Sequence, residues 1–174
     1  GAFPRFEREP FLAAPFVARL PRELRDGIAT HGLRNSHLAA IAPAGTISVL
    51  AGGVSSGIEP VFALEGMRRV RQEDGTFAEV PVACPALLEW RAAAAPGSAL
   101  PDAFVTATGI GAEAQLRMQA ALQPHVDNAI SKTTNVAADI AHDDFASIYA
   151  RAFELGLKGC TVFRPNPVTG SILR

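Results

Sequence analysis

Apolar residues recur at intervals of three and four along several stretches of the chain, which is the pattern of helices that bury one face. The clearest example is Asp143–Leu155, where five side chains are expected to share one face: Phe145, Ile148, Tyr149, Ala152 and Phe153. Gly156 follows and is expected to end this helix, because glycine tolerates the left-handed conformation found after a last helical turn. The same reasoning predicts four further helices, at Phe11–Leu20, Pro21–Thr30, Pro85–Ala95 and Ala112–Leu122.

Other stretches have the short β-branched runs and the alternation of strands. Met67–Val70 and Phe77–Val82 flank Asp74-Gly75, and Asp-Gly between two such runs predicts a β-hairpin. Val126–Val136 and Leu157–Phe163 lie on either side of the helix just described. We therefore expect a strand–helix–strand unit whose two strands run parallel.

Residues 38–53 combine a strand-like pattern with a helix-like one. Leu38–Ala42 is a short apolar run, Pro43 interrupts it, and Ile47–Ala51 is a second apolar run that ends at Gly52-Gly53. This order predicts a strand, a tight turn at residues 44–46, and the start of a helix.

The turn before this helix has a specific chemical use. The N–H groups of a first helical turn lack intrahelical partners and carry partial positive charge, and Gly45 has no side chain to block a ligand. A phosphate would fit there, with the hydroxyls of Thr46 and Ser48 as further donors. The alternative is an ordinary strand-to-helix turn with Thr46 as N-cap, which the residues by themselves favour. No lysine follows Gly45, so this is not the GxxxxGK[ST] phosphate loop.

Several charged residues have two interpretations. Lys132 lies in a predicted strand, where it can hold an anionic substrate or pair with a buried carboxylate, or else reach water from the strand end. Arg68, Arg69 and Arg71 can contact a phosphate, although charges that cover an exposed hairpin edge are the simpler interpretation. Three polar residues near the helix at 112–122 are expected by default to face solvent, with the interior as the alternative: Arg117, Gln119 and Gln123.

The composition indicates a globular domain but does not identify a binding partner. The chain has 174 residues, of which 48% are hydrophobic and 19% charged, as in an ordinary globular domain. A net charge of −1 and the lack of a basic block give no pull toward nucleic acid. Short, interrupted apolar runs predict no membrane span, and we expect a cytoplasmic protein. Cys84, Cys160 and the scattered histidines have no metal-binding spacing, so no metal site and no disulfide are expected.

Three blocks of sequence together resemble one protein family. Asn35–Phe62 contains Ala-Pro-Ala-Gly-Thr-Ile-Ser and Ser-Ser-Gly-Ile-Glu-Pro-Val-Phe, Asp127–Asn135 reads Asp-Asn-Ala-Ile-Ser-Lys-Thr-Thr-Asn, and Gly156–Asn166 reads Gly-Leu-Lys-Gly-Cys-Thr-Val-Phe-Arg-Pro-Asn. In this order they resemble the C-terminal part of the catalytic barrel of class II, adenosylcobalamin-dependent ribonucleotide reductases. The resemblance implies an α/β fold, the C-terminal portion of a ten-stranded barrel, with the hairpin as an insertion.

The resemblance also implies a role for the turn. In that family the matching loop holds the substrate phosphates, which here places them on Pro43, Ala44, Gly45, Thr46, Ile47 and Ser48. The family usually has Thr where this chain has Ala44, so one hydroxyl donor is missing. Glu59 lies in a family motif near the active-site end and, with Lys132, is a candidate for the active-site rim. It can act as general acid or base, or, in the favoured interpretation, accept backbone hydrogen bonds.

The family's radical chemistry needs residues that this chain lacks. Its thiyl-radical cysteine lies in an Asn-Pro-Cys-Gly-Glu type motif, which does not occur here, and neither Cys84 nor Cys160 matches it. No catalytic residue is therefore assigned, and we expect the isolated chain to be inactive. Adenosylcobalamin would be the cofactor of the full enzyme.

We expect a single domain over residues 1–174, with a helical leading segment at 1–34, barrel strands and helices at 35–166, and a tail at 167–174. The expected partners are a ribonucleoside diphosphate or triphosphate substrate and the rest of the reductase barrel. Open strand edges also predict self-association. Two alternatives remain at this point: a non-catalytic binding or assembly module that completes a partner's barrel, and a structural remnant that binds nothing.

Overall fold

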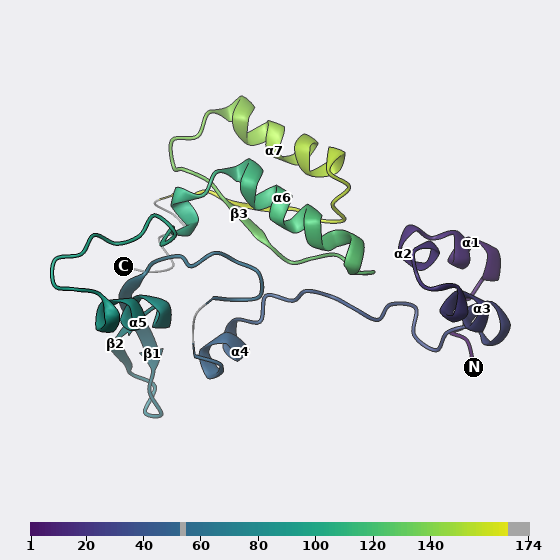
Figure 1. Cartoon of the computed structure of the whole chain (residues 1–174), viewed down its shortest axis with the longest axis horizontal. Coiled ribbons are helices and arrows are strands. Elements are labelled where there is room, and N and C mark those ends of the chain that lie inside the picture. The colour runs from purple at the N-terminus through teal and green to yellow at the C-terminus, as the bar shows by residue number, and fades with distance from the viewer. Residues whose placement is uncertain (53–54, 167–174) are drawn as a thin grey trace.

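The computed structural model, which describes residues 1–52 and 55–166, shows three groups of elements in chain order (Figure 1). The first comprises the N-terminal helices α1 (Arg8–Ala13), α2 (Pro15–Ala18) and α3 (Arg22–His31). Phe3, Phe6 and Phe11 pack ring to ring within it. The single helix expected at Phe11–Leu20 is wrong, because Pro15 lacks an N–H and begins a new helix. The expected tail at 167–174 lies outside the described residues.

An extended segment leads from α3 to the rest of the molecule (Figure 1). Within it, Ile41 forms a parallel bridge with Ile130. Asn128 N–H donates to Ala39 O and Ser131 N–H to Ile41 O, at 3.1 and 2.9 Å. The stretch expected to be a strand thus pairs with a neighbour, although by a single bridge. It leads into α4 (Gly45–Leu50).

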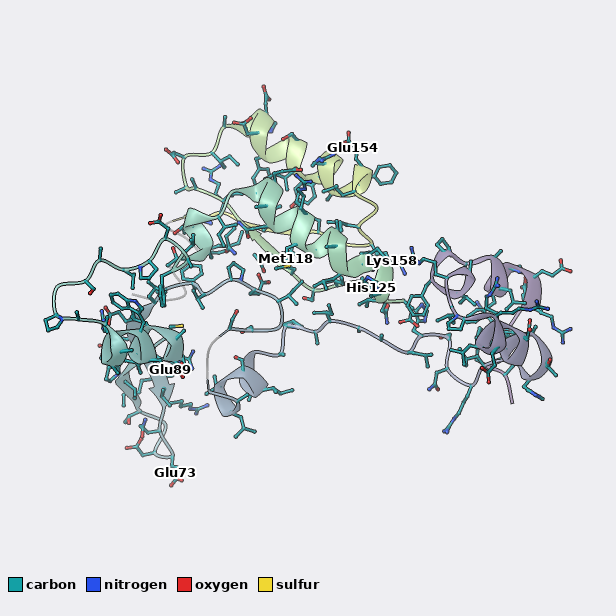
Figure 2. The ribbon with its side chains drawn as sticks, viewed as in Figure 1. Glu73, Glu89, Met118, His125, Glu154 and Lys158 are labelled. Carbon is teal, nitrogen blue, oxygen red and sulfur yellow. The ribbon has the colours of Figure 1, made fainter. Side chains whose placement is uncertain are left out.

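The second group is the expected hairpin with the helix that follows it. Strands β1 (Glu65–Arg71) and β2 (Phe77–Ala83) pair antiparallel along their whole length. The turn at the tip, where Glu73 projects (Figure 2), is closed by Asp74, whose Oδ1 accepts from Thr76 N–H at 2.9 Å. Helix α5 (Pro85–Ala93) follows. Arg91 binds Glu65 through two hydrogen bonds of 2.8 Å and thereby ties α5 to β1.

The third group contains the buried core. Helices α6 (Ala112–Leu122) and α7 (His142–Glu154) lie beside the parallel strands β3 (Thr133–Asn135) and β4 (Thr161–Phe163), with short 3-10 turns η1 (Ala107–Gly109) and η2 (Gln123–His125) flanking α6. Four apolar side chains form the centre of the core: Leu116, Val136, Ile148 and Ala152. The parallel strand–helix–strand unit is confirmed, with strands shorter than expected.

The architecture is mixed α/β, as expected, but the strands do not close a barrel. Within residues 1–52 and 55–166 the strands form two two-stranded sheets and the isolated bridge at Ile41. The ten-stranded barrel implied by the resemblance is therefore not seen in this chain alone. Among the same residues, no helix has both the length and the apolar character to cross a membrane.

Candidate functional site: a pocket between α4, the hairpin and the β3–β4 pair

A pocket of about 870 Å³ lies where the second and third groups meet the loop after α4. Its apolar wall includes Phe62, Val162 and Phe163. Its polar lining comes from several elements: Ser48 of α4, Ser55, Ser56 and Glu59 of the following loop, Arg68 and Arg69 of β1, Thr133 and Asn135 of β3, and Thr161 of β4. Pockets of this size, mostly apolar with a few converging polar groups, are typical of small-molecule sites.

The turn predicted to bind phosphate borders this pocket. Ala44 has a left-handed backbone (φ 52°) and is the N-cap of α4, so the helix begins at Gly45, two residues earlier than expected. No side chain caps it, and the alternative with Thr46 as N-cap is therefore wrong. The first helical bond runs from Ser48 N–H to Ala44 O at 2.8 Å, which leaves the N–H groups of residues 45–47 without intrahelical acceptors.

The six predicted phosphate-binding residues are placed unequally. Pro43 and Ser48 line the pocket, and the Ser48 hydroxyl donates to Gly45 O at 2.7 Å. Gly45 and Thr46 are exposed, and Ile47 keeps 68% of its surface exposed. The turn is thus open to a ligand from solvent as well as from the pocket.

Gly57 holds the loop after α4 against the end of the preceding extended segment. Its φ is +55°, and a Cβ built on it would lie 2.7 Å from Ala42 O. Only glycine allows this conformation and this close approach together. Two bonds then shape the loop: Glu59 N–H donates to Ser56 O at 2.9 Å, and the Ser55 hydroxyl donates to Glu59 O.

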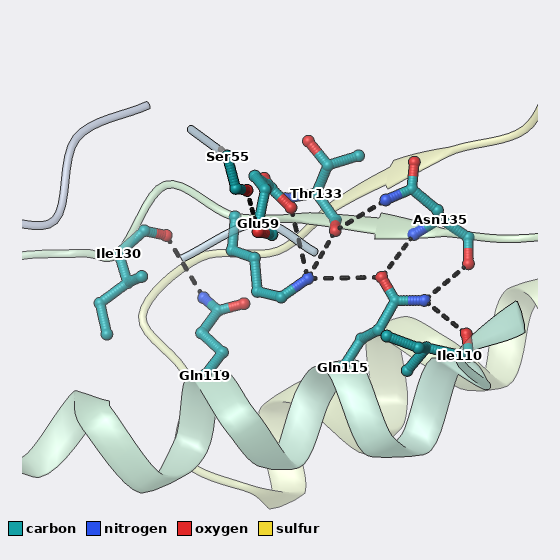
Figure 3. A network of polar contacts seen from close by, with 9 residues as sticks. Ser55, Glu59, Ile110, Gln115, Gln119, Ile130, Thr133 and Asn135 are labelled. Atoms are coloured by element: carbon teal, nitrogen blue, oxygen red, sulfur yellow. Dashed lines mark hydrogen bonds and ion pairs between the residues drawn. The ribbon is translucent and has the colours of Figure 1, made fainter. Parts of the chain in front are cut away.

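Lys132 and Glu59, predicted separately, meet in a buried network beside the pocket (Figure 3). The Lys132 side chain is 1% exposed, and its Nζ lies 3.4 Å from Glu59 Oε2. It also donates to Gln115 Oε1 at 3.3 Å and to Thr133 O at 2.7 Å. The other Glu59 oxygen accepts from Thr133 N–H. Lys132 is therefore paired with a carboxylate rather than reaching water, and Glu59 bonds a backbone N–H of β3 rather than of its own loop.

Burial sets the chemistry of this network. Burial lowers the pKa of Lys132, because the charged form loses its solvation, while the Glu59 charge acts in the opposite direction. Nearby, burial raises the pKa of Cys160, although the Thr134 hydroxyl and the Lys132 charge oppose the rise. A thiol with a raised pKa stays protonated at neutral pH, which agrees with Cys160 as a packing residue rather than a nucleophile.

A stripe of three glutamines on one side of α6 and η2 holds the backbone of the neighbouring strands. Gln115 Nε2 donates to Ile110 O and Asn135 O, Gln119 Nε2 to Ile130 O and Gly159 O, and Gln123 Nε2 to Val126 O and Asn128 O. All three side chains are buried, whereas Arg117 is exposed. The default expectation of solvent is therefore wrong for Gln119 and Gln123. Their spacing of four residues was the sequence signal for a shared face.

Asp127 also has a structural role that the sequence alone did not indicate. Its carboxylate accepts from Leu38 N–H at 2.6 Å and Ala39 N–H at 2.7 Å, which fixes the extended segment beside residues 128–131. Burial alone would raise the pKa of Asp127, but the bonds from Ala39 and Leu38 together outweigh it and lower that pKa. Lys158, in the segment between α7 and β4 (Figure 2), donates from Nζ to Asp127 O.

Comparison with known proteins identifies the family. The family described as "Ribonucleotide reductase, barrel domain" matches residues 17–163, and the chain belongs to it. Several relatives are named as vitamin B12-dependent enzymes. A vitamin B12-dependent ribonucleoside-diphosphate reductase of Mycobacterium tuberculosis (strain CDC 1551 / Oshkosh) is 35% identical over 159 residues, covering 80% of this chain and 22% of its own length.

Two further relatives agree. A vitamin B12-dependent ribonucleoside-diphosphate reductase of Thermoplasma acidophilum is 34% identical, covering 81% of this chain and 20% of its own length. A vitamin B12-dependent ribonucleotide reductase of Rhodopirellula baltica is 32% identical, covering 82% of this chain and 17% of its own length. The chain therefore spans about a fifth of the length of these relatives.

Proposed function

We propose that this chain is the part of a vitamin B12-dependent ribonucleoside-diphosphate reductase that holds the substrate's phosphates, and that the radical cysteine is supplied elsewhere. The observation that carries the proposal is the turn at residues 43–48, which presents N–H groups without intrahelical acceptors at the border of a large pocket. Such N–H groups bind anions because they combine hydrogen-bond donation with the partial positive charge of the helix start.

The lining of the pocket supports a nucleotide as the ligand. Phe62 and Phe163 offer aromatic surface for a base, while Ser55, Thr133 and Asn135 offer hydrogen-bonding groups for a ribose. Its volume of about 870 Å³ lies in the range of small-molecule sites. The substrate is then a ribonucleoside diphosphate or triphosphate whose phosphates lie on the turn.

Glu59 and Lys132 support this site instead of reacting with the substrate. Glu59 borders the pocket, but both of its oxygens are engaged, by Lys132 and by Thr133 N–H. Lys132 is 1% exposed and has no free path to a ligand. We assign them to the rim of the active site as a pair that fixes the loop after α4 to β3.

Adenosylcobalamin would supply the radical chemistry of the complete enzyme. Among residues 1–52 and 55–166, no cluster of three or more His, Cys, Asp or Glu side chains is arranged to hold a metal ion. The pocket's hydroxyls and guanidinium groups suit phosphate and ribose more than a corrin ring. We place no cobalamin contact on the described residues.

A second candidate is a non-catalytic module that completes the barrel of another chain. It is favoured by the strands themselves, since β3–β4 forms only a two-stranded sheet with unfilled edges among the described residues. Co-purification with a chain that carries the radical-cysteine motif, together with reductase activity only in the mixture, would support a split enzyme. A stable complex without activity would support the module.

The proposal is tested by calorimetric titration of the chain with a ribonucleoside diphosphate. Gly45→Asp places a carboxylate at the turn, and Gly45→Ala is the matched control, because a Cβ there has only Ser56 Oγ nearby, at 3.9 Å. We expect Gly45→Asp to abolish binding and Gly45→Ala to retain most of it. Equal binding by all three proteins would contradict the assignment of the phosphates to this turn.

A further inference from the structure

Strand β1 carries three arginines, and only some of them face the pocket. Side chains alternate along a strand, so Arg68 lies on one face of the hairpin while Arg69 and Arg71 lie on the other. Arg68 is half-buried and lines the pocket. Arg69 also borders the pocket, but its guanidinium lies over the Phe77 ring, 4.0 Å from the ring centre. Arg71 is exposed and does not line the pocket.

Among the described residues, no acidic side chain balances the charge of Arg68. Of the other cations beside the pocket, Arg69 lies over the Phe77 ring, and Lys132 is paired with Glu59 at 3.4 Å. Among residues 1–52 and 55–166, the Arg68 guanidinium forms no ion pair, hydrogen bond or ring contact. A half-buried cation without a counter-ion is unfavourable by itself, and an anionic ligand in the same pocket would remove that cost.

From this arrangement we infer that Arg68 is a substrate-binding residue whose guanidinium binds a phosphate group of the nucleotide. The inference rests on the proposed function, because it assigns a further contact within the same pocket. The turn at residues 43–48 offers backbone donors but contains no cationic side chain. Arg68 supplies that positive charge from a separate element, in the planar, two-donor geometry that suits a phosphate.

The hairpin therefore has a function in the site as well as an exposed edge. Arg68 lies opposite Val80 in the register of the two strands, so the pairing of β1 with β2 fixes its position along the pocket. We expect the hairpin to be ordered by its own hydrogen bonds before a ligand arrives. The cation is then held in place instead of being recruited from solvent, which reduces the entropic cost of binding.

The test compares Arg68→Gln with Arg71→Gln, a matched change on the opposite face of the same strand. Each protein is titrated with a ribonucleoside diphosphate and with the corresponding nucleoside. We expect Arg68→Gln to weaken diphosphate binding about tenfold or more, because a hydrogen bond to a charged group is lost, and to leave nucleoside binding unchanged. Arg71→Gln should bind both as the unsubstituted chain does.

A second measurement tests the contact between Arg68 and the phosphate in the unsubstituted chain. Phenylglyoxal modifies free guanidinium groups, and peptide mass spectrometry locates the modified arginines. We expect the diphosphate, but not the nucleoside, to protect Arg68 and to leave Arg71 reactive. Undiminished diphosphate affinity in Arg68→Gln, or no protection of Arg68, would overturn the inference.

The outcomes separate this inference from the proposed function. If Gly45→Asp abolishes binding while Arg68→Gln does not weaken it, the turn holds the phosphates and the role of Arg68 is overturned. If Arg68→Gln weakens binding while Gly45→Asp does not, the phosphates are held at the hairpin and the assignment to the turn fails. No binding by the unsubstituted chain at millimolar diphosphate would overturn both.

Discussion

Lys132 carries three N–H donors, and the structure gives each an acceptor, on Glu59, Gln115 and Thr133. This complete set is what allows an ammonium group to lie 1% exposed inside the protein. A buried ion pair adds little stability relative to an apolar pair, but removing one partner leaves a charge without compensation. The two residues should therefore respond very differently to single and to double substitution.

We predict that Glu59→Gln lowers the free energy of unfolding by about 3 kcal/mol, because Lys132 remains buried without its counter-ion. The double variant Glu59→Gln/Lys132→Met should regain part of this loss, since no buried charge is left. Urea denaturation at neutral pH measures both. If Glu59→Gln were as stable as the unsubstituted protein, the ion pair could not be what holds the loop against β3.

The same pair gives a pH dependence with a defined sign. The pKa of Lys132 in the folded protein lies below its ordinary value of 10.5, so between the two values the unfolded chain binds more protons. The free energy of unfolding from this group therefore rises with pH through that window. Cys160 contributes the opposite sign above its ordinary value of 9.0, because its folded pKa is raised.

We therefore predict that, in a Cys160→Ala background, stability rises with pH below the ordinary lysine pKa of 10.5, relative to the variant that also carries Lys132→Met. Glu59→Gln should move the start of this rise to lower pH, because the pKa of Lys132 falls further without the carboxylate. Chemical denaturation at several pH values measures the difference. Parallel pH profiles with and without Lys132 would contradict the prediction.

Asp127 gives a prediction at acid pH. Its folded pKa lies below the ordinary value of 3.8, so it contributes stability that is present above that value and lost as pH falls through the folded pKa. Asp127→Asn should lower the free energy of unfolding by about 2 kcal/mol at neutral pH, because one accepting oxygen and the charge are lost. Hydrogen exchange at the Leu38 and Ala39 amides should accelerate. Asp139→Asn, at an exposed site, is the control and should change neither.

At the scale of elements, the sequence predicted helices better than strands. The helix Ala112–Leu122 has the bounds expected from its periodicity, and the hairpin forms at the expected Asp-Gly turn. Val126–Val136 and Leu157–Phe163, expected to be strands, contribute only three residues each to the ladder. Four of their remaining carbonyl groups, those of Val126, Asn128, Ile130 and Gly159, accept from glutamine side chains instead of from a neighbouring strand. Strand propensity does not indicate whether a carbonyl group will accept from a neighbouring strand or from a side chain.

The candidate site was predictable only where the signal is local. The positions of Pro43 and Gly45 predict the turn within residues 43–48. Lys132 is a candidate because it is a cation within a predicted strand. Asp127 and Gln119 bond groups far away in the chain, and Arg68 matters through its position beside a pocket. Such roles depend on long-range packing: the four-residue spacing of the glutamines indicates a shared helix face, but it does not identify the carbonyl groups that they bind.

We predict that Gln119→Met lowers the free energy of unfolding by about 1 to 3 kcal/mol, because Ile130 O and Gly159 O lose their shared donor in a buried place. The side chains have similar volumes, so a packing defect is not expected to dominate. Arg117→Met, at an exposed position two residues earlier, is the control and should change stability little. Thermal and urea unfolding measure the two variants. Equal losses would show that the amide is not responsible.

At the scale of the whole molecule, the chain leaves apolar surface uncovered on α4. Ile47, Val49 and Leu50 are 68%, 53% and 90% exposed, within a helix of six residues. A helix this short gains its stability from packing rather than from its own hydrogen bonds. Exposed apolar surface of this kind favours association, and in the isolated chain another copy can cover it.

We predict that the isolated chain self-associates and that Leu50→Lys reduces this association. Phe153→Lys, at a residue 85% exposed on α7, is the matched control and should reduce it less. Sedimentation velocity over a wide range of protein concentration measures all three. A chain that stays strictly monomeric at every concentration would contradict the prediction.

The glutamine stripe also has a consequence for how the molecule opens. Gln115 and Gln119 of α6 and Gln123 of η2 donate to carbonyl groups of two separate segments, so α6 cannot slide or lift away without breaking contacts with both at once. Local opening follows the boundaries of such mutually dependent groups. The amide hydrogens of α6, β3 and β4 should therefore exchange with solvent together, as one cooperative unit, while those of the hairpin exchange independently.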